Sequence, residues 1–129
     1  MRDTDLLEAA RAALEHSYSP YSHLPVGAAI ECADGTVFTG ANIENAAFPS
    51  TICAEAAALS AAVSAGKREF RRIAIVADAP NYPYPCGNCR QLLAEFSPNI
   101  EVLARRGNGS YVSFPLSDLF PERFAFRLD

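Results

Sequence analysis

Hydrophobic and polar positions alternate with two different periods along the chain, and the switches between them mark the predicted elements. Apolar residues recur every three or four positions near the start, which predicts an amphipathic helix capped by Thr4 and ending at about His16. Prolines among serines and tyrosines in SPYSHLP then favour extended or turn geometry. The segment VGAAIECADGTVFTGAN is typical of a hairpin, with strands near 26–32 and 37–42 around the turn ADGT.

Helical and extended patterns continue to alternate through the rest of the chain. An alanine-rich helix is predicted from about Cys53 to Ala65, where Gly66 closes it, and another from about Cys86 to Glu95. The segments RIAIVADA, IEVLAR and YVSFPL are β-rich, and LSDLFPERF is predicted to form a short terminal helix. This order of elements predicts an α/β fold in which a mixed five-stranded sheet is packed between helices.

Length, composition and charge limit the class of protein. A chain of 129 residues, half of them hydrophobic and a fifth charged, is expected to form a single domain over residues 1–129. The net charge is −4 and the sequence pI is about 5.1. Basic residues form no cluster larger than isolated pairs such as Arg71–Arg72 and Arg105–Arg106, so nucleic acid is not expected as a partner. No apolar run approaches the roughly 18 residues that a membrane span needs, and the chain does not start with a signal-peptide core. A cytoplasmic location without a membrane partner is therefore expected.

Four cysteines in a reducing compartment are more typical of metal ligands, catalytic groups or core residues than of disulfides. Cys86 and Cys89 form a C-x-x-C pair in the first turn of a predicted helix, a spacing that fits a zinc half-site or a thiol–disulfide oxidoreductase. A catalytic zinc takes three protein ligands and leaves one position open for water, and Cys53 is the available third ligand. The positive ends of two helix dipoles would offset part of the negative charge of three thiolates. Cys32 lies in mid-strand without a partner at ligand spacing, so it is expected to be a buried free thiol.

Glu55 follows Cys53 by two residues, close enough to reach a metal-bound water without binding the metal. Zinc lowers the pKa of bound water toward neutrality, and a carboxylate there can accept its proton, pass it to a ring nitrogen and later protonate a leaving amine. Taken singly, a cysteine in an alanine-rich helix is more often a core residue, and a first-turn glutamate often only complements the helix dipole. The conjunction of C-A-E with a later P-C-x-x-C is much harder to obtain by chance.

These motifs resemble those of the small, homotetrameric, zinc-dependent cytidine deaminases. The resemblance runs through SPYSHLPVGAAI, GANIENAAFPSTICAE, PCGNCRQLLAEF and LFPERF, and so covers almost the whole chain. It implies a three-layer cytidine-deaminase-like fold, one zinc ion held by the three thiols named above, and Glu55 as the catalytic proton shuttle. The implied reaction is the hydrolytic deamination of cytidine or deoxycytidine to uridine or deoxyuridine, with release of ammonia, as in pyrimidine salvage.

The resemblance also implies roles for residues around the metal. Asn42 and Glu44 would bind the ribose hydroxyls, although loop residues of these types ordinarily cap a turn. The backbone of Ala54 would contact the pyrimidine, and Arg90 would support the cysteine cluster. Three further residues match positions that family members lend to the active site of a neighbouring subunit: Ala46, Phe48 and Phe124. A homotetramer with shared active sites is therefore expected.

Three positions depart from the family pattern. Ala56 replaces an arginine that donates to the zinc thiolates, which would leave zinc a weaker Lewis acid unless Arg90 or another donor compensates. Leu24 replaces the aromatic residue that packs beside the base, and Phe48 replaces a tyrosine. These departures suggest a roomier or differently shaped base pocket, with N4-substituted or unusual cytosine nucleosides as an alternative substrate class.

Other interpretations remain open. A deaminase for an antibiotic of the blasticidin kind would carry similar motifs, although NIEN and SPYS favour the plain nucleoside. A non-catalytic structural zinc module would use Cys32 as a fourth sulfur ligand, and a C-x-x-C redox protein would bind no zinc; neither explains Glu55. His23 is expected to be a loop histidine near the pocket rim, because a fourth protein ligand would close the metal's open position. The tyrosines of YPYP could stack on a base, but they are expected to be ordinary exposed residues of a turn.

Overall fold

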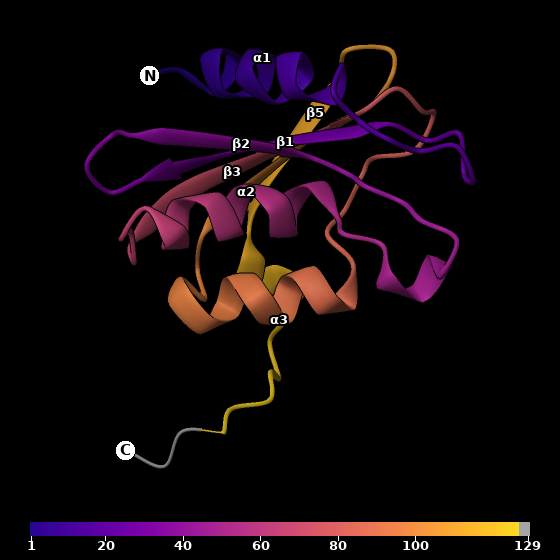
Figure 1. Ribbon diagram of the computed structural model, residues 1–129. Coiled ribbons are helices and arrows are strands. Elements are labelled where there is room, and N and C mark those ends of the chain that lie inside the picture. The colour runs from indigo at the N-terminus through magenta and orange to yellow at the C-terminus, as the bar shows by residue number, and fades with distance from the viewer. Residues whose placement is uncertain (127–129) are drawn as a thin grey trace.

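The computed structural model describes residues 1–126, within which three α-helices and five β-strands form (Figure 1). In chain order these elements are α1 (Asp3–Leu14), β1 (Val26–Cys32), β2 (Val37–Ala41), α2 (Ala54–Ser64), β3 (Phe70–Ala77), α3 (Gly87–Phe96), β4 (Glu101–Arg105) and β5 (Tyr111–Pro115). The sheet order is β2-β1-β3-β4-β5, with β3 and β4 parallel and every other neighbouring pair antiparallel. The predicted mixed five-stranded sheet is therefore confirmed.

The sheet is covered on both faces. Helix α1 lies on one face, and α2 and α3 lie on the other (Figure 1). Two glycines allow the helices to approach the hairpin closely: a Cβ on Gly27 would lie 2.1 Å from the Ala10 carbonyl oxygen in α1, and a Cβ on Gly40 would lie 2.5 Å from the Ala58 nitrogen in α2. A side chain at either position would force a helix away from the strands.

A buried ion pair joins α1 to the sheet beneath it. Glu31 and Arg72 are directly paired across β1 and β3, and the Arg72 guanidinium donates to both carboxylate oxygens of Glu31, at 2.8 and 3.0 Å. The same guanidinium donates to Asp3 at 2.7 Å, in the first turn of α1. These hydrogen bonds hold the pKa of the Glu31 carboxyl below its usual value, so this buried acid is charged and paired at neutral pH.

One predicted helix and the predicted start of another are wrong. The segment LSDLFPERF forms only a short 3₁₀ turn, η2 (Leu116–Asp118), because Pro121 cannot continue a helical hydrogen-bond ladder. Helix α1 begins before Thr4: Arg2 is its N-cap, and the Arg2 backbone N–H donates to the Asp5 carboxylate at 2.9 Å. The carboxylate of Asp5, at the third helical position, therefore caps the start of the helix in place of Thr4.

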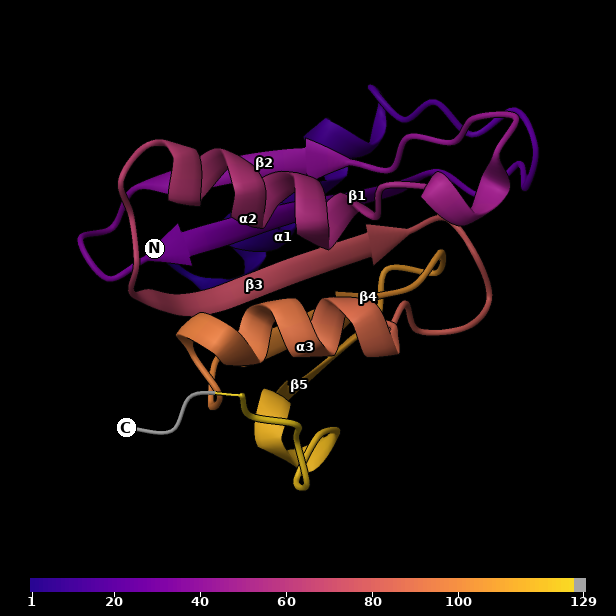
Figure 2. The ribbon, with the colours of Figure 1, turned by 60° about the horizontal axis from the view of Figure 1, so that its bottom comes forward.

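Helices α2 and α3 run side by side with their N-termini at the same end of the sheet, the end where β3 finishes (Figures 1 and 2). The chain enters α2 through a second 3₁₀ turn, η1 (Phe48–Ser50). Within residues 1–126, no helix combines the length and the apolar character that crossing a membrane requires. The arrangement gathers two helix starts and a parallel strand end at one place, which in α/β sheets is the common position of a binding site.

Candidate active site

Three cysteine thiols meet where α2 and α3 begin. Cys53 is the N-cap of α2, Cys86 is the N-cap of α3, and Cys89 lies in the first turn of α3. Their sulfur atoms lie within 4.8 Å of one another, and the Cys53 and Cys86 sulfurs are 3.9 Å apart. Tetrahedral zinc with Zn–S bonds of about 2.3 Å requires sulfurs about 3.8 Å apart. The thiols therefore fit one zinc ion in both chemistry and spacing.

The electrostatics of the cluster favour negative sulfur. A hydrogen bond from the Cys89 thiol, with a further contribution from Cys86, lowers the pKa of the Cys53 thiol to about 6. The same interaction raises the pKa of Cys89, which also lies fully buried. Negative charge is therefore concentrated on Cys53, at a helix N-terminus where the dipole stabilises it. A thiolate at this position is the form that binds zinc.

Glu55 is a buried acid beside the thiols. It lies in the first turn of α2, and only 6% of its surface is exposed. Burial raises the pKa of the Glu55 carboxyl to about 7, and the negative charge of Cys53 adds to this rise. Among the described residues, the side chains close enough to hold a metal ion here are those of the three cysteines, and the Glu55 carboxylate is not one of them. The structure thus brings a proton-carrying group next to a three-ligand metal site.

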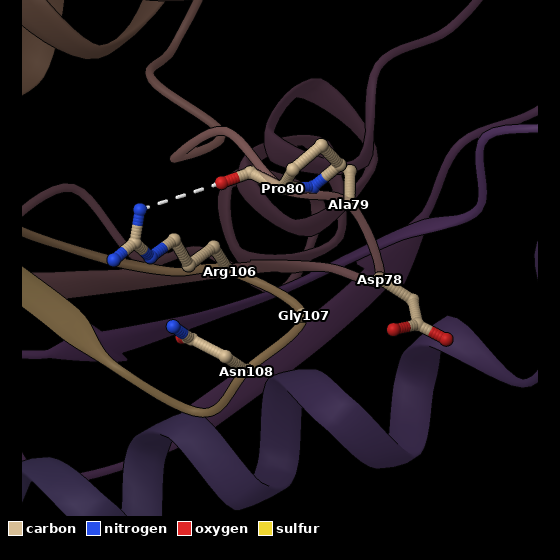
Figure 3. A pocket seen from close by; sticks show the side chains of 6 residues that line it. All are labelled: Asp78, Ala79, Pro80, Arg106, Gly107 and Asn108. Carbon is tan, nitrogen blue, oxygen red and sulfur yellow. Dashed lines mark hydrogen bonds between the residues drawn. The ribbon is translucent and has the colours of Figure 1, made fainter.

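A cavity of about 190 Å³ opens at this point. It is lined by Val26, Asn42, Thr51, Cys53, Ala54, Glu55, Tyr84 and Cys86. A larger hollow of about 470 Å³ lies elsewhere, between the end of β3 and the β4–β5 turn (Figure 3). There Arg106 reaches toward the Pro80 carbonyl while the Asp78 carboxylate points away from it (Figure 3). None of the residues described as lining that hollow is a cysteine or Glu55, so the smaller cavity is the candidate active site.

Asn42 and Glu44 organise the loop that precedes β1. Asn42 lines the cavity, accepts a hydrogen bond from the Val26 N–H at 2.9 Å and donates to the Leu24 carbonyl at 2.9 Å. Glu44 is 3% exposed and accepts hydrogen bonds from the backbone N–H groups of Tyr21 and Ser22, both at 3.0 Å. These two side chains therefore fix the shape of the SPYS loop beside the cavity.

The remaining sequence-predicted residues divide between the cavity and the surface. Ala54 is fully buried and lines the cavity. Leu24 is 40% exposed and does not contribute to the cavity wall formed by residues 1–126. The three residues expected to serve a neighbouring subunit are exposed: Ala46, Phe48 and Phe124. The structure thus gathers the metal and proton-transfer candidates within one chain and leaves these other residues at the surface.

Arg90 acts on the backbone around Cys86. It donates to the Pro85 carbonyl at 2.8 Å and to the Leu119 carbonyl at 3.1 Å. Its guanidinium therefore connects the loop that carries Cys86 to the η2 turn. Within residues 1–126, both of its hydrogen bonds go to backbone carbonyl oxygens rather than to the thiols. Ala56, at the position of the missing arginine, lies partly buried on α2.

Two residues outside the cluster were weighed as ligands from the sequence. Cys32 is 1% exposed at the end of β1, and burial raises the pKa of its thiol. Among the described residues, it does not belong to the cluster of cysteines that could hold a metal ion. His23 adopts a left-handed backbone conformation with φ of 58° in the SPYS loop. Neither belongs to the group of thiols. Tyr84 is exposed, as expected for a tyrosine between prolines, but it also lines the cavity, which agrees with the alternative that the YPYP tyrosines meet a base.

This α/β/α sandwich groups three thiols, and two of them, Cys53 and Cys86, line one cavity together with the buried carboxylate of Glu55. That arrangement fits a zinc-dependent hydrolytic enzyme. Three protein ligands leave the metal a fourth position for water, as catalytic rather than structural zinc sites do. The residues that hold the metal come from two helix starts, and the proton carrier comes from one of them.

Known proteins with this arrangement identify the family. Residues 1–104 match the cytidine and deoxycytidylate deaminase zinc-binding region. A cytidine deaminase from Sporosarcina psychrophila is 41% identical over 121 residues, covering 93% of this chain and 89% of the relative. The crystal structure of a cytidine deaminase from Burkholderia pseudomallei has a TM-score of 0.93 at 42% identity, covering 96% of this chain and 100% of that one. A blasticidin-S deaminase from Bacillus cereus is 32% identical over 135 residues, covering 95% and 92%.

The chain therefore belongs to the cytidine and deoxycytidylate deaminase family. The three-layer cytidine-deaminase-like fold expected from the sequence is confirmed, and zinc is the metal that the thiol cluster fits.

Proposed function

We propose that this protein hydrolyses cytidine and deoxycytidine to the corresponding uridine nucleoside and ammonia, as a single catalytic domain. The observation that carries the proposal is the placement of Glu55 in the same cavity as the Cys53 and Cys86 thiols. A structural zinc site has no use for a buried acid at that point, since its metal is closed by four protein ligands.

Zinc, when bound by Cys53, Cys86 and Cys89, supplies a Lewis acid that makes water a nucleophile near neutral pH. Glu55 takes the proton of the attacking water and donates it to N3 of the pyrimidine as the new C4–O bond forms. It then carries the proton of the new C4 hydroxyl to the amino group, which leaves as ammonia as the C4–N4 bond breaks and the C4 carbonyl of the uridine product forms. The backbone of Ala54, buried beside Glu55, contacts the pyrimidine ring.

Asn42 and Glu44 are proposed to bind the ribose hydroxyls. Asn42 lines the cavity, and within residues 1–126 its amide NH₂ group donates one hydrogen bond, to the Leu24 carbonyl, which leaves its second N–H for a ligand. Glu44 accepts hydrogen bonds from Tyr21 and Ser22, and a carboxylate has about four lone-pair positions, so it can accept one more from a sugar hydroxyl. Both would bind the sugar with side chains already fixed by the loop.

The plain nucleoside is favoured over the N4-substituted or antibiotic alternatives. Leu24 lies at the surface rather than in the cavity wall formed by residues 1–126, so exchanging an aromatic residue for leucine there does not itself enlarge the cavity of one chain. The blasticidin-S deaminase is also less similar to this chain than the cytidine deaminases described above are.

We further propose a homotetramer with shared active sites in the cytoplasm. Phe48 and Phe124 are 48% and 67% exposed, and large apolar side chains in that condition support burial against another subunit. A cavity of about 190 Å³ is smaller than the roughly 300 Å³ at which ligand pockets ordinarily begin, which also supports completion by a neighbour. The four cysteines form no disulfide among themselves, as expected in a reducing compartment.

The function is tested by measuring zinc content and the loss of cytidine absorbance with the purified protein. The expected result is about one zinc ion per chain and rapid deamination, with Glu55→Gln keeping the zinc but losing activity by at least about 100-fold, since general acid–base catalysis contributes about 10²–10⁴-fold. Zinc with no turnover of cytidine or deoxycytidine would contradict the proposal. Substantial activity of Glu55→Gln would contradict the role of that residue.

A further inference from the structure

Tyr84 forms part of the active-site cavity, and the chemistry proposed above gives it no role. It lines the same cavity as Cys53, Cys86 and Glu55, and 49% of the residue is exposed. A tyrosine in a proline-rich turn is ordinarily a solvated surface residue. A tyrosine that borders the three-thiol metal site lies where a substrate must bind.

The ring of Tyr84 is supported by other aromatic rings. Its centroid lies 5.7 Å from that of Phe114 on β5 and 6.1 Å from that of Tyr82, with interplanar angles of 47° and 54°. Rings at these separations attract one another beyond the area that they bury. Pro83 and Pro85 flank Tyr84 and restrict the backbone on both sides. The ring is therefore held in position with little conformational freedom left to lose on binding.

The support continues into the larger hollow. The Arg106 guanidinium lies 4.6 Å from the centre of the Tyr82 ring, and the Tyr82 hydroxyl is 3.2 Å from the Ser110 hydroxyl. Arg106 also donates to Ser110 at 2.9 Å and reaches toward the Pro80 carbonyl (Figure 3). Arg106, which lines the hollow, and the contact between the Tyr82 and Ser110 hydroxyls thus hold the segment between β3 and α3 against the β4–β5 turn, and that segment carries Tyr84.

The position of Tyr84 decides which part of a nucleoside it can meet. It precedes Cys86 by two residues, so the two Cα atoms are at most about 7 Å apart. Asn42, the candidate sugar contact, lines the same cavity from the end of the hairpin. The tyrosine ring therefore lies near the reacting end of the substrate, where the planar base must be.

We propose that Tyr84 is a substrate-binding residue whose aromatic ring contacts the planar pyrimidine base. This inference rests on the proposed function, because it assumes that the cavity takes a nucleoside. Aromatic side chains stack on bases through their π faces, and the ring supplies the contact whether or not it carries a hydroxyl. An aromatic residue at this position should therefore be required, and a phenylalanine should serve as well as a tyrosine.

The test measures cytidine binding by calorimetry on zinc-loaded Glu55→Gln protein, which binds substrate without consuming it, and KM and kcat on the otherwise unchanged enzyme. Tyr84→Phe should keep the Kd and KM within about twofold, while Tyr84→Leu should raise both by about 5- to 30-fold, the lower part of the range for base stacking. Leucine keeps an apolar side chain without a π face, so the comparison isolates the ring. Tyr111→Leu, on β5 outside the cavity, is the matched control and should change neither value.

Two results would overturn the inference. Wild-type Kd and KM in Tyr84→Leu would show that the ring does not contact the base. A loss in Tyr84→Phe as large as in Tyr84→Leu would show that the hydroxyl, not the aromatic face, is what matters. Zinc content and thermal unfolding of each variant exclude a collapsed site as the cause, and a wild-type enzyme that ignores cytidine would contradict the proposed function instead.

Discussion

Cys89 is fully buried, Cys53 is partly buried and Cys86 is exposed, although their sulfurs lie within 4.8 Å of one another. The cluster therefore has an inner side in the core and an outer side toward the cavity. A ligand on the inner side cannot be replaced by water without opening the core between α2 and α3. The three thiols should accordingly differ in how far their loss disturbs the fold.

Cys32 offers a test of whether the zinc site is closed or open. A structural module would use Cys32 as a fourth ligand, but its thiol is buried at the end of β1, outside the group of thiols. We expect Cys32→Ala to keep about one zinc ion per chain, and Cys89→Ala to lose nearly all of it, because two sulfurs are too few for a stable site. Metal analysis after dialysis against a weak chelator measures both. Zinc loss in Cys32→Ala would restore the structural interpretation.

The sequence predicted the thiols and Glu55 as neighbours because all four lie within the first turns of two helices. At a helix start the spacing along the chain determines direction, so C-A-E and C-x-x-C carry geometry as well as chemistry. Base stacking by Tyr84 was ranked below an exposed turn because the support of its ring comes from Phe114, and from Arg106 through Tyr82, and both are distant in the chain. The one local signal was its position two residues before Cys86. The Leu119 partner of Arg90 could not be predicted for the same reason.

At the scale of elements, the close approach of α2 to β2 is what carries Cys53 and Glu55 to the cavity. We expect Gly40→Ala to lower the free energy of unfolding by about 3 kcal/mol, because its Cβ would meet backbone atoms of Ala58 and Ala54 that cannot turn aside. The displaced helix should also weaken zinc binding. Urea unfolding and chelator competition measure the two effects.

Thr39→Ala provides the control for this prediction, since Thr39 is exposed on the same strand. Its unfolding free energy should change by no more than about 1 kcal/mol, and its zinc affinity should not change. If Gly40→Ala unfolded at the same urea concentration as the wild type, α2 would be able to accommodate the extra methyl group, and the prediction would be wrong. Loss of stability with unchanged zinc affinity would show that the metal site does not depend on how α2 is seated.

The elements themselves were predictable where local pattern and tertiary packing agree. The strands of the hairpin and the two cysteine-led helices lie within one or two residues of their predicted limits, since their apolar faces are the ones that the core buries. The prediction of a terminal helix was wrong because the apolar residues there have helical spacing, but Pro121 cannot donate the backbone hydrogen bond that would continue a helix. The start of α1 shifted because Asp5, rather than Thr4, satisfies the first N–H group.

At the scale of the whole molecule, a set of exposed apolar residues lies around the SPYS loop and η1. Ile43 is bridged to both Tyr18 and Ile52, and the rings of Tyr21 and Phe48 are 6.3 Å apart with an edge-to-face tilt. All five are at least 45% exposed. Contiguous apolar residues of this kind beside a small cavity favour contact with a second copy that would both cover them and close the cavity.

We therefore expect light scattering during size-exclusion chromatography to give about four times the chain mass of 13.9 kDa. Ile43→Glu would bury a charge in the interface, so it should reduce the assembly and lower activity by at least about tenfold, although Ile43 is not among the residues lining the cavity within one chain. Tyr111→Glu adds the same charge on β5 and should leave mass and activity unchanged. A fully active monomer would contradict shared sites. A dissociated but fully active Ile43→Glu protein would separate assembly from catalysis, and Phe48 and Phe124 would then have no part in the neighbouring site.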